Sequence, residues 1–325
     1  MATPSADRAW TNKKRNGGRR FWTRETTPDH KPVTINERDL AVLRHLFEHR
    51  LTNTRLLHKQ LGGSYRALSR RLRQLSLDGY LERPTAQIHY YKQGGGSDCM
   101  VFALSTKGAR TLKQKGDTPF ARNLSAKNKT VRQPFIDHTV ATTRFMTDLA
   151  MSCRKRPNTH LLLPDAVRAR APLKTRQDKR QTMGWHVQVR VGDKQKHLAV
   201  IPDKMFSLLD SDSDEVSHFC LETDRASMPV ISNNIDRSSI LRKILAYREV
   251  FRTRAHERVF GWANMRVILE TTTSDHADTI KQCIRDVYGT HKTGMFLVAT
   301  ERQTTDQDLL AHSFETAFGD KVRLV

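Results

Sequence analysis

The chain has 325 residues, of which 56 are Lys or Arg and 34 are Asp or Glu, so its formal net charge is +22. This length suits about two domains, and a charge this positive favours a polyanionic partner. No apolar run approaches the roughly 20 residues that a membrane span needs, and no N-terminal segment is typical of a signal peptide, so we expect a cytoplasmic protein.

The positive charge is concentrated in the first part of the chain. Residues 1–132 hold 27 Lys or Arg and 10 Asp or Glu, whereas residues 133–325 hold 29 and 24. This asymmetry predicts that the N-terminal part binds nucleic acid. The four cysteines lie far apart and form no CxxC pair, which disfavours a zinc knuckle and a disulfide scaffold; they are Cys99, Cys153, Cys220 and Cys283.

Residues 1–33 are basic and show no periodicity, so we expect a disordered arm. Residues 34–48 predict a helix, with Thr34 or Asn36 as its cap. Two further helices follow over residues 54–61 and 65–78, the latter capped by Ser64.

The helix over residues 65–78 has an apolar face and a basic face. Leucines recur at helical spacing on one side, and the other side carries Arg66, Arg70, Arg71 and Arg73. After it, residues 88–91 and 100–104 predict two strands joined across Gly94–Ser97, and residues 106–115 predict another helix.

Three helices followed by a Gly-tipped hairpin resemble a winged helix-turn-helix domain over residues 34–116. The resemblance implies that the third helix enters the major groove of double-stranded DNA and that the hairpin touches the adjacent backbone. The four arginines would then contact DNA; the alternative is a solvated helix face.

Residues 117–132 are polar and basic, which predicts a linker. A helix is expected over residues 135–154, and a loop or weak strand pair over residues 165–183. From residue 186 onward the pattern predicts strands and helices in mixed order, typical of an α/β domain with a mixed sheet over residues 133–325. The expected strands are 186–191, 198–201, 205–209, 217–221, 265–269 and 295–298, and the expected helices are 238–252 and 275–287.

Two short motifs in this second domain carry acidic residues at strand ends. "IPDKMFSLL" contains Asp203, and "HFCLETD" contains Glu222 and Asp224. Together they resemble the PD-(D/E)xK nuclease core, in which an Asp and a Glu on adjacent strands bind Mg²⁺. The resemblance implies that Asp203 and Glu222 bind Mg²⁺ or Mn²⁺, since hard cations prefer oxygen ligands.

The match departs from the family pattern at one position, because Asp224 stands where the family has its lysine. Three interpretations remain open. Asp224 is a further metal ligand, or the cation has moved to Lys243 in a Lys243–Tyr247 pair one helical turn apart, or the site is inactive.

The order of these features resembles the plasmid replication-relaxation family and its MobC-type relaxases. The resemblance covers roughly residues 34–300 and implies a restriction-endonuclease-like domain after the winged helix. By position, Asp203, Glu222, Asp224 and Lys243 would be catalytic and Tyr247 accessory. The helix before the sheet often supplies a His-Glu pair in this family, but here His138 is followed by Thr139, so His138 is only an accessory candidate.

The sequence therefore predicts an α+β multidomain protein that cleaves one DNA strand with the help of a metal. The resemblance implies a nickase in plasmid mobilisation or conjugation that acts at a transfer or replication origin, with relaxosome or coupling proteins as partners. The alternative is a non-catalytic DNA-binding accessory factor or transcriptional regulator with a degenerate nuclease fold.

Overall fold

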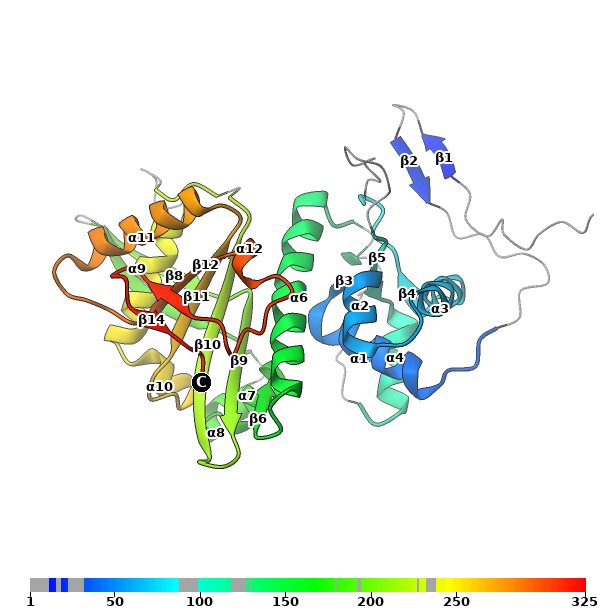
Figure 1. Cartoon of the computed structure of the whole chain (residues 1–325), viewed down its shortest axis with the longest axis horizontal. Helices are drawn as coiled ribbons and strands as arrows, with labels where there is room; N and C mark the ends of the chain where they lie inside the picture. The colour runs from blue at the N-terminus through cyan, green and yellow to red at the C-terminus, as the bar shows by residue number, and fades with distance from the viewer. Residues whose placement is uncertain are drawn as a thin grey trace, which may run out of the picture. The chain divides into compact units, whose positions relative to one another are not determined.

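The computed structural model describes residues 12–15, 19–22, 32–87, 99–117, 127–128, 130–178, 180–191, 194–226, 228–231 and 238–325. The chain forms two compact units, Met1–Thr143 and Arg144–Val325. Their boundary lies inside helix α6 (Gln133–Arg154; Figure 1), whereas the sequence predicted it within residues 117–132. Both halves of α6 bury apolar residues, Ile136 in the first unit and Phe145 in the second, so the pattern gave no sign of a boundary there.

The helices described in the first unit begin at polar caps. Asn36 accepts a hydrogen bond from the backbone N–H of Asp39, and the Asp39 carboxylate accepts one from the N–H of Asn36. Ser64 caps the third helix as predicted. Before α6, these helices are α1 (Glu37–His49), α2 (Thr54–Leu61), α3 (Tyr65–Leu77) and α4 (Thr106–Gln114).

A three-stranded antiparallel sheet accompanies these helices, in the order β3-β5-β4. Its strands are β3 (Leu51–Asn53), β4 (Leu81–Glu82) and β5 (Val101–Leu104). β5 confirms the strand expected over residues 100–104. The strand expected over residues 88–91 and its glycine-rich tip lie outside the described residues.

A two-stranded antiparallel ribbon lies in the N-terminal arm. It consists of β1 (Asn12–Arg15) and β2 (Arg19–Trp22). The sequence predicted a disordered arm here, because these short, basic segments show no apolar alternation that would reveal a strand.

The second unit is built on a seven-stranded mixed sheet in the order β14-β13-β12-β11-β10-β9-β6. β10, β11 and β12 run parallel, and the other pairs are antiparallel. The strands are β6 (Thr159–Leu162), β9 (Lys204–Asp210), β10 (Glu215–Asp224), β11 (Arg266–Thr271), β12 (Phe296–Thr300), β13 (Phe314–Thr316) and β14 (Lys321–Val322). A separate ribbon pairs β7 (Trp185–Val191) with β8 (Lys194–Val200).

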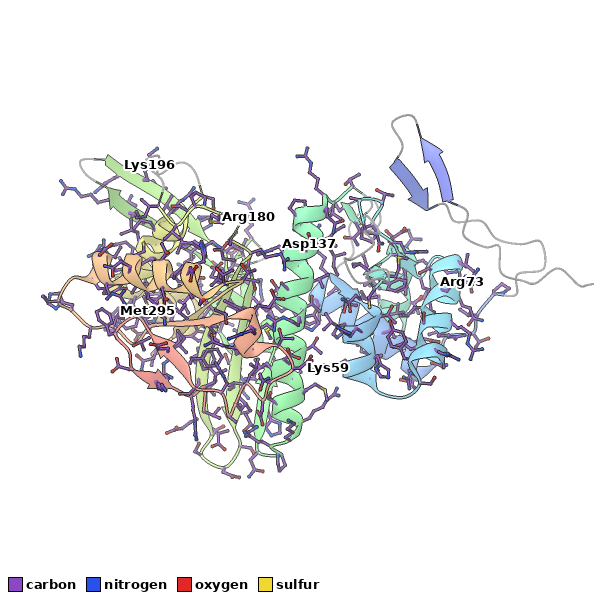
Figure 2. All side chains as sticks on the ribbon, turned by 45° about the horizontal axis from the view of Figure 1, so that its top comes forward. Lys59, Arg73, Asp137, Arg180, Lys196 and Met295 are labelled. Atoms are coloured by element: carbon purple, nitrogen blue, oxygen red, sulfur yellow. The ribbon has the colours of Figure 1, made fainter. Side chains whose placement is uncertain are left out.

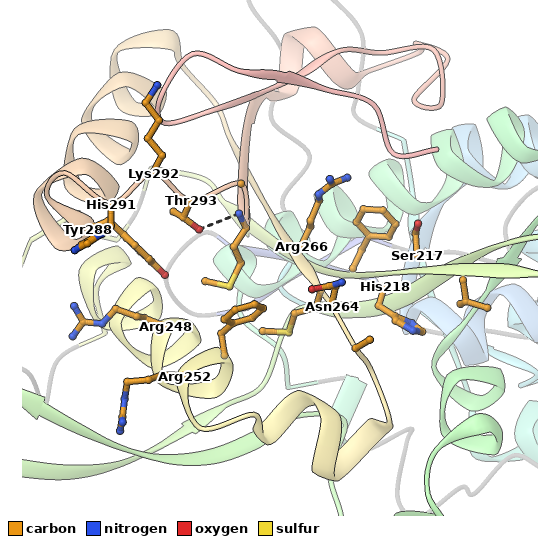
Figure 3. A pocket seen from close by; sticks show the side chains of 17 residues that line it. Ser217, His218, Arg248, Arg252, Asn264, Arg266, Tyr288, His291, Lys292 and Thr293 are labelled. Atoms are coloured by element: carbon orange, nitrogen blue, oxygen red, sulfur yellow. Dashed lines mark hydrogen bonds between the residues drawn. The ribbon is translucent and has the colours of Figure 1, made fainter.

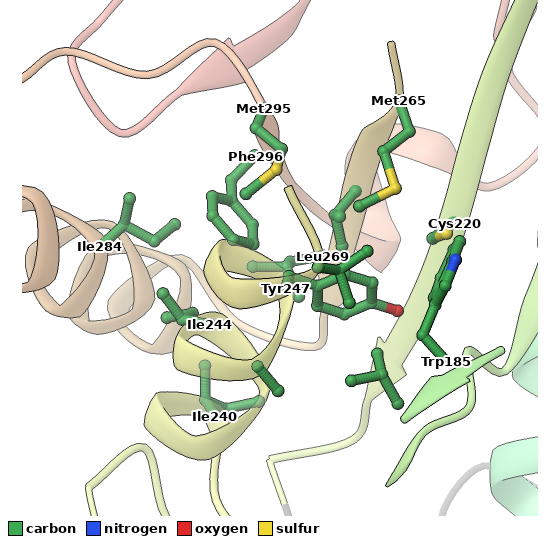
Figure 4. Close-up of a cluster of buried hydrophobic side chains, with 14 of the residues drawn as sticks. Trp185, Cys220, Ile240, Ile244, Tyr247, Met265, Leu269, Ile284, Met295 and Phe296 are labelled. Atoms are coloured by element: carbon green, nitrogen blue, oxygen red, sulfur yellow. The ribbon is translucent and has the colours of Figure 1, made fainter. Parts of the chain in front are cut away.

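Helices cover both faces of this sheet. α9 (Ile240–Arg252) and α11 (Ser274–Tyr288) pack on one face, where Ile244, Tyr247 and Ile280 share a core with the ribbon (Figure 4). The second half of α6 packs on the other face through residues such as Phe145. Buried on both faces, β11 and β12 contain the continuous apolar runs Val267–Leu269 and Phe296–Ala299, as parallel strands in such layers usually do. This explains why the sequence located them correctly.

Shorter elements were missed or misassigned. Residues 165–183 were expected to be a loop or strand pair, but they contain α7 (Pro164–Arg170) and α8 (Leu173–Gln177). Both are too short to show a helical repeat. The sequence also did not predict α10 (Ala255–Phe260) or α12 (Glu301–Thr304).

Within the described ranges, no helix combines the length and apolar character that crossing a bilayer requires. All four cysteines carry free thiols, and Cys153, Cys220 and Cys283 are buried.

Candidate functional site

The register of β9 and β10 brings the two predicted carboxylates together. Lys204 pairs with Leu221, so Asp203 lies beside Glu222 at the point where β9 begins and β10 approaches its end. The backbone N–H of Thr223 donates a hydrogen bond of 2.8 Å to Oδ2 of Asp203. The Glu222 side chain is only 3% exposed.

Helix α9 supplies two partners for Glu222. Ser239 caps this helix and sets its register. Lys243 Nζ lies 2.6 Å from Oε2 of Glu222, and the Tyr247 hydroxyl donates a 2.5 Å hydrogen bond to Oε1. Figure 4 shows the Tyr247 ring reaching from α9 toward β10. The predicted Lys243–Tyr247 pair therefore faces Glu222, and we call Asp203, Glu222, Lys243 and Tyr247 the carboxylate cluster.

The charges in the carboxylate cluster are strongly coupled. Burial raises the pKa of Glu222, Lys243 lowers it, and the neighbouring carboxylate of Asp203 raises it again, so the net shift is upward. For Lys243, burial lowers the pKa, but Glu222, Asp203 and Asp224 outweigh this and raise it. Lys243 therefore remains a cation in the midst of three carboxylates.

The sequence missed His276, which binds the third carboxylate. Nε2 of His276 lies 2.5 Å from Oδ2 of Asp224, and both side chains are largely buried. His276 lies in the first turn of α11, which follows β11, the parallel neighbour of β10. Because parallel strands end at the same sheet edge, a residue just after β11 lies near the end of β10. This argument from the order of the strands was the signal by which His276 could have been found.

A second polar cluster lies on the opposite face of the same strands, and the sequence gave no indication of it. Arg144 of α6 pairs with Glu270 of β11, and the Thr304 hydroxyl also donates to Glu270. Arg144 also contacts Asp148 at 3.4 Å. Because its ionic groups are paired, this cluster fits a structural role.

The two neighbouring carboxylates suit a hard cation. Mg²⁺ usually takes one or two protein carboxylates and completes its shell with water and phosphate. Burial and, to a smaller extent, the neighbouring Asp203 carboxylate raise the pKa of Glu222, and a bound cation would relieve the repulsion between the two carboxylates. Among the described residues, no three or more His, Cys, Asp or Glu side chains are arranged to hold a metal by themselves. His276 binds Oδ2 of Asp224, and the role of Asp224 as a metal ligand stays a prediction.

The four predicted DNA-binding arginines of α3 do not share one environment. Arg66 and Arg70 are exposed, and Arg73 is half-buried and projects from α3 (Figure 2). Arg71 instead binds the buried Asp39 at 2.6 Å and donates to the carbonyl of Thr34. The prediction for Arg71 therefore needs correction, because its guanidinium ties α3 to the start of α1.

The accessory candidate His138 lies in the part of α6 that belongs to the first unit, where its side chain is half-buried. The carboxylate cluster belongs to the second unit. The structure does not place His138 relative to that cluster.

The fold and the cluster define a mixed α+β protein with a buried carboxylate–lysine–tyrosine site at one end of a sheet. Residues 43–263, more than half of the chain, match the family described as replication-relaxation, and the chain belongs to this family. The family indicates a role in the replication or relaxation of plasmid or mobile-element DNA. Comparison with curated proteins and with solved structures gave no match.

Proposed function

We propose that this protein is a metal-dependent DNA nickase, a relaxase that acts at a transfer or replication origin of a plasmid or mobile element. The second unit would cleave one strand, and the first would bind the duplex as a winged helix. On this proposal the second unit is a restriction-endonuclease-like domain of the PD-(D/E)xK type, related to MobC-type relaxases.

One observation supports the proposal most directly. The nuclease pattern expects a lysine two residues after the glutamate, on the same strand. In this protein Lys243, on helix α9, brings its Nζ to 2.6 Å from Oε2 of Glu222. The lysine missing at position 224 is thus replaced in space by a lysine on α9. This favours the interpretation that the catalytic cation has moved to Lys243 over the interpretation that the site is inactive.

The residues of the cluster have distinct roles on this proposal. Asp203 and Glu222 would hold Mg²⁺ or Mn²⁺, which when bound lowers the pKa of a water molecule and stabilises charge on the phosphoryl oxygens. The Lys243 ammonium attracts the scissile phosphate to the cluster. Tyr247 is fully buried and holds the orientation of Glu222 through its hydroxyl.

His276 is placed for proton transfer. Its bond to Asp224 fixes the orientation of the imidazole ring, as a carboxylate commonly does for a catalytic histidine. Such a ring can accept a proton from the attacking water or donate one to the leaving oxygen. The side chain is 18% exposed, so it remains accessible to solvent.

The first unit supports the DNA-binding part of the proposal. The order α1, β3, α2, α3, β4 and β5 resembles that of a winged helix, and α3 exposes Arg66 and Arg70. In such domains the third helix lies in the major groove. Origin DNA is then the substrate, and relaxosome or coupling proteins are the proposed partners.

Conversion of supercoiled plasmid to open circle tests the proposal. The plasmid carries the DNA that flanks the gene, and the reaction contains full-length protein with Mg²⁺, Mn²⁺ or EDTA. We expect nicking with either metal and none with EDTA, and Asp203→Asn should abolish nicking while leaving the affinity for DNA unchanged. A gel shift by the wild-type protein without nicking under any metal would instead establish the alternative, a non-catalytic DNA-binding accessory factor or regulator.

A further inference from the structure

The second unit contains a large basic pocket away from the carboxylate cluster. Its volume is about 910 Å³, within the range of small-molecule sites. It is lined by the beginning of β10, by the end of α9, and by the segments that lead into β11 and β12 (Figure 3). Leu269 of β11 is the strand partner of Glu222. Arg266, the first residue of β11, precedes Leu269 by three residues, so it lies about 10 Å from it along the strand.

The charge of this pocket is entirely positive. Its cationic side chains are Arg248 and Arg252 from α9, Arg266 from β11 and Lys292 from the loop after α11. None of the described residues that line it is acidic. Glu249, just outside the lining, binds Arg252 at 2.8 Å and therefore neutralises part of the α9 charge.

Two of the cations have no such partner. Neither the Arg266 guanidinium nor the Lys292 ammonium forms an ion pair or hydrogen bond with any residue that the structure describes. Arg266 is half-buried and Lys292 is exposed. Cations that line a concave surface without carboxylates attract an anion from outside.

Aromatic rings lie beside these cations. Phe251 lines the pocket and is 42% exposed, unusually high for a phenylalanine, and Tyr288 and His218 also line it. Exposed rings beside basic groups are the pattern on which unpaired bases stack while their phosphates bind Lys and Arg. An acidic peptide would use the cations but would gain little from the rings.

We propose that this pocket binds a nucleotide unit through its phosphate, with the base against Phe251. The nucleotide is either free or part of a single strand, because a paired base within a duplex has no open face for stacking. Binding here does not depend on cleavage at the carboxylate cluster, so this inference stands or falls separately from the proposed nickase activity.

Chemical protection of Lys292 tests the proposal locally in the full-length protein. The protein is treated with an amine-acylating reagent, and modification is quantified by peptide mass spectrometry with no ligand, with an octamer of deoxythymidylate, with dTMP or with a polyglutamate peptide. We expect the octamer to protect Lys292 several-fold and to leave Lys321, an exposed lysine outside the pocket, unchanged. Protection by dTMP identifies a free-nucleotide site, and protection by the octamer alone identifies a strand site. No protection by either, or equal protection by polyglutamate, would overturn the proposal.

A matched pair of double variants gives the second measurement. Arg266→Gln with Lys292→Gln removes the two unpaired pocket cations, and Lys321→Gln with Arg323→Gln removes the same charges from an exposed edge outside the pocket. For the pocket variant we expect an affinity for the octamer about tenfold lower at 50 mM salt and a log–log salt slope smaller by about 1.4, since each single-strand phosphate contact contributes about 0.7. Equal losses in the two variants would contradict a pocket-specific site.

Discussion

Glu222 is the residue whose surroundings most clearly distinguish this protein from a structural α+β domain. A glutamate that is 3% exposed is costly unless its charge is compensated. Here a lysine and a tyrosine hydroxyl bind its two oxygen atoms separately. The sequence predicted all three residues as candidates, because PD, LE and K-x-x-x-Y patterns are short-range and visible in one dimension.

Removing the hydroxyl of Tyr247 tests the energetic role of this arrangement. In Tyr247→Phe, Oε1 of Glu222 stays buried but loses its donor, so the free energy of unfolding should fall by about 1–3 kcal/mol. Urea unfolding measures the change. Tyr80→Phe is the control, because that half-buried hydroxyl forms no hydrogen bond with any described residue, and it should change the free energy by less than about 0.5 kcal/mol. Equal effects of the two substitutions would remove Tyr247 from its proposed role.

His218 makes the stability of the protein depend on pH. Burial, with a smaller contribution from Arg170, lowers the pKa of His218 from 6.5 to about 4. Between pH 4 and pH 6.5, His218 binds a proton in the unfolded chain but not in the folded chain. The contribution of His218 to the free energy of unfolding is therefore complete above pH 6.5 and is lost as the pH falls toward 4.

The variant His218→Phe retains a ring that can stack on Trp262, 4.6 Å away, but cannot titrate. We expect the wild type to lose about 2 kcal/mol more stability than this variant between pH 7.5 and 4.5. Chemical denaturation at the two pH values provides the comparison. Parallel pH profiles would show that His218 does not contribute to the pH dependence.

At the scale of elements, α3 shows where a sequence pattern reaches its limit. The spacing of arginines on one helix face correctly indicated which residues avoid the core. It could not show that Asp39, 32 positions earlier in the chain, lies within 2.6 Å of Arg71. Ion pairs between distant elements depend on tertiary packing, which carries no local signal.

The arginines of α3 should therefore separate into two classes. Arg66→Gln with Arg70→Gln removes two exposed charges, so the affinity for duplex DNA should fall and the salt slope should decrease by about 1.8, with stability unchanged. Arg71→Gln leaves the buried Asp39 without its cation and should lower the free energy of unfolding by about 2 kcal/mol. Titrations at several salt concentrations and urea unfolding distinguish the classes. A stability loss in the first variant, or none in Arg71→Gln, would contradict this division.

The termini of parallel strands explain what the sequence missed in the second unit. The strands β11 and β12 were predictable, because each contains a short apolar run and the periodic helix α11 lies between them. Which strands are neighbours was not visible in the order of strands and helices. The contact of His276 with Asp224 depends on β10 lying directly beside β11, so it became apparent only from the sheet topology.

At the scale of the whole molecule, the two units carry different chemistry. The first holds most of the net positive charge, and the second holds the carboxylate cluster and the basic pocket. Composition predicted this division of labour, which stays a prediction, and the chain belongs to the replication-relaxation family. The position of the boundary within α6 was not predictable, since a continuous helix shows no break in its pattern.

On the proposed function, cleavage and DNA binding can be separated by a single substitution. Glu222→Gln retains the shape of the side chain and an oxygen that can accept from Tyr247, but it removes the carboxylate charge. Glu270→Gln is the matched control, because Glu270 is an equally buried glutamate on the neighbouring strand that pairs with Arg144 on the opposite face.

The decisive measurement is the rate of plasmid nicking in Mg²⁺ by wild type, Glu222→Gln and Glu270→Gln, with DNA affinity measured in parallel. The account predicts that Glu222→Gln nicks at least about 100-fold more slowly at unchanged affinity, as expected when a group essential to catalysis is removed, and that Glu270→Gln retains most of its activity. Nicking by Glu222→Gln at the wild-type rate would contradict the assignment of the carboxylate cluster as the catalytic centre.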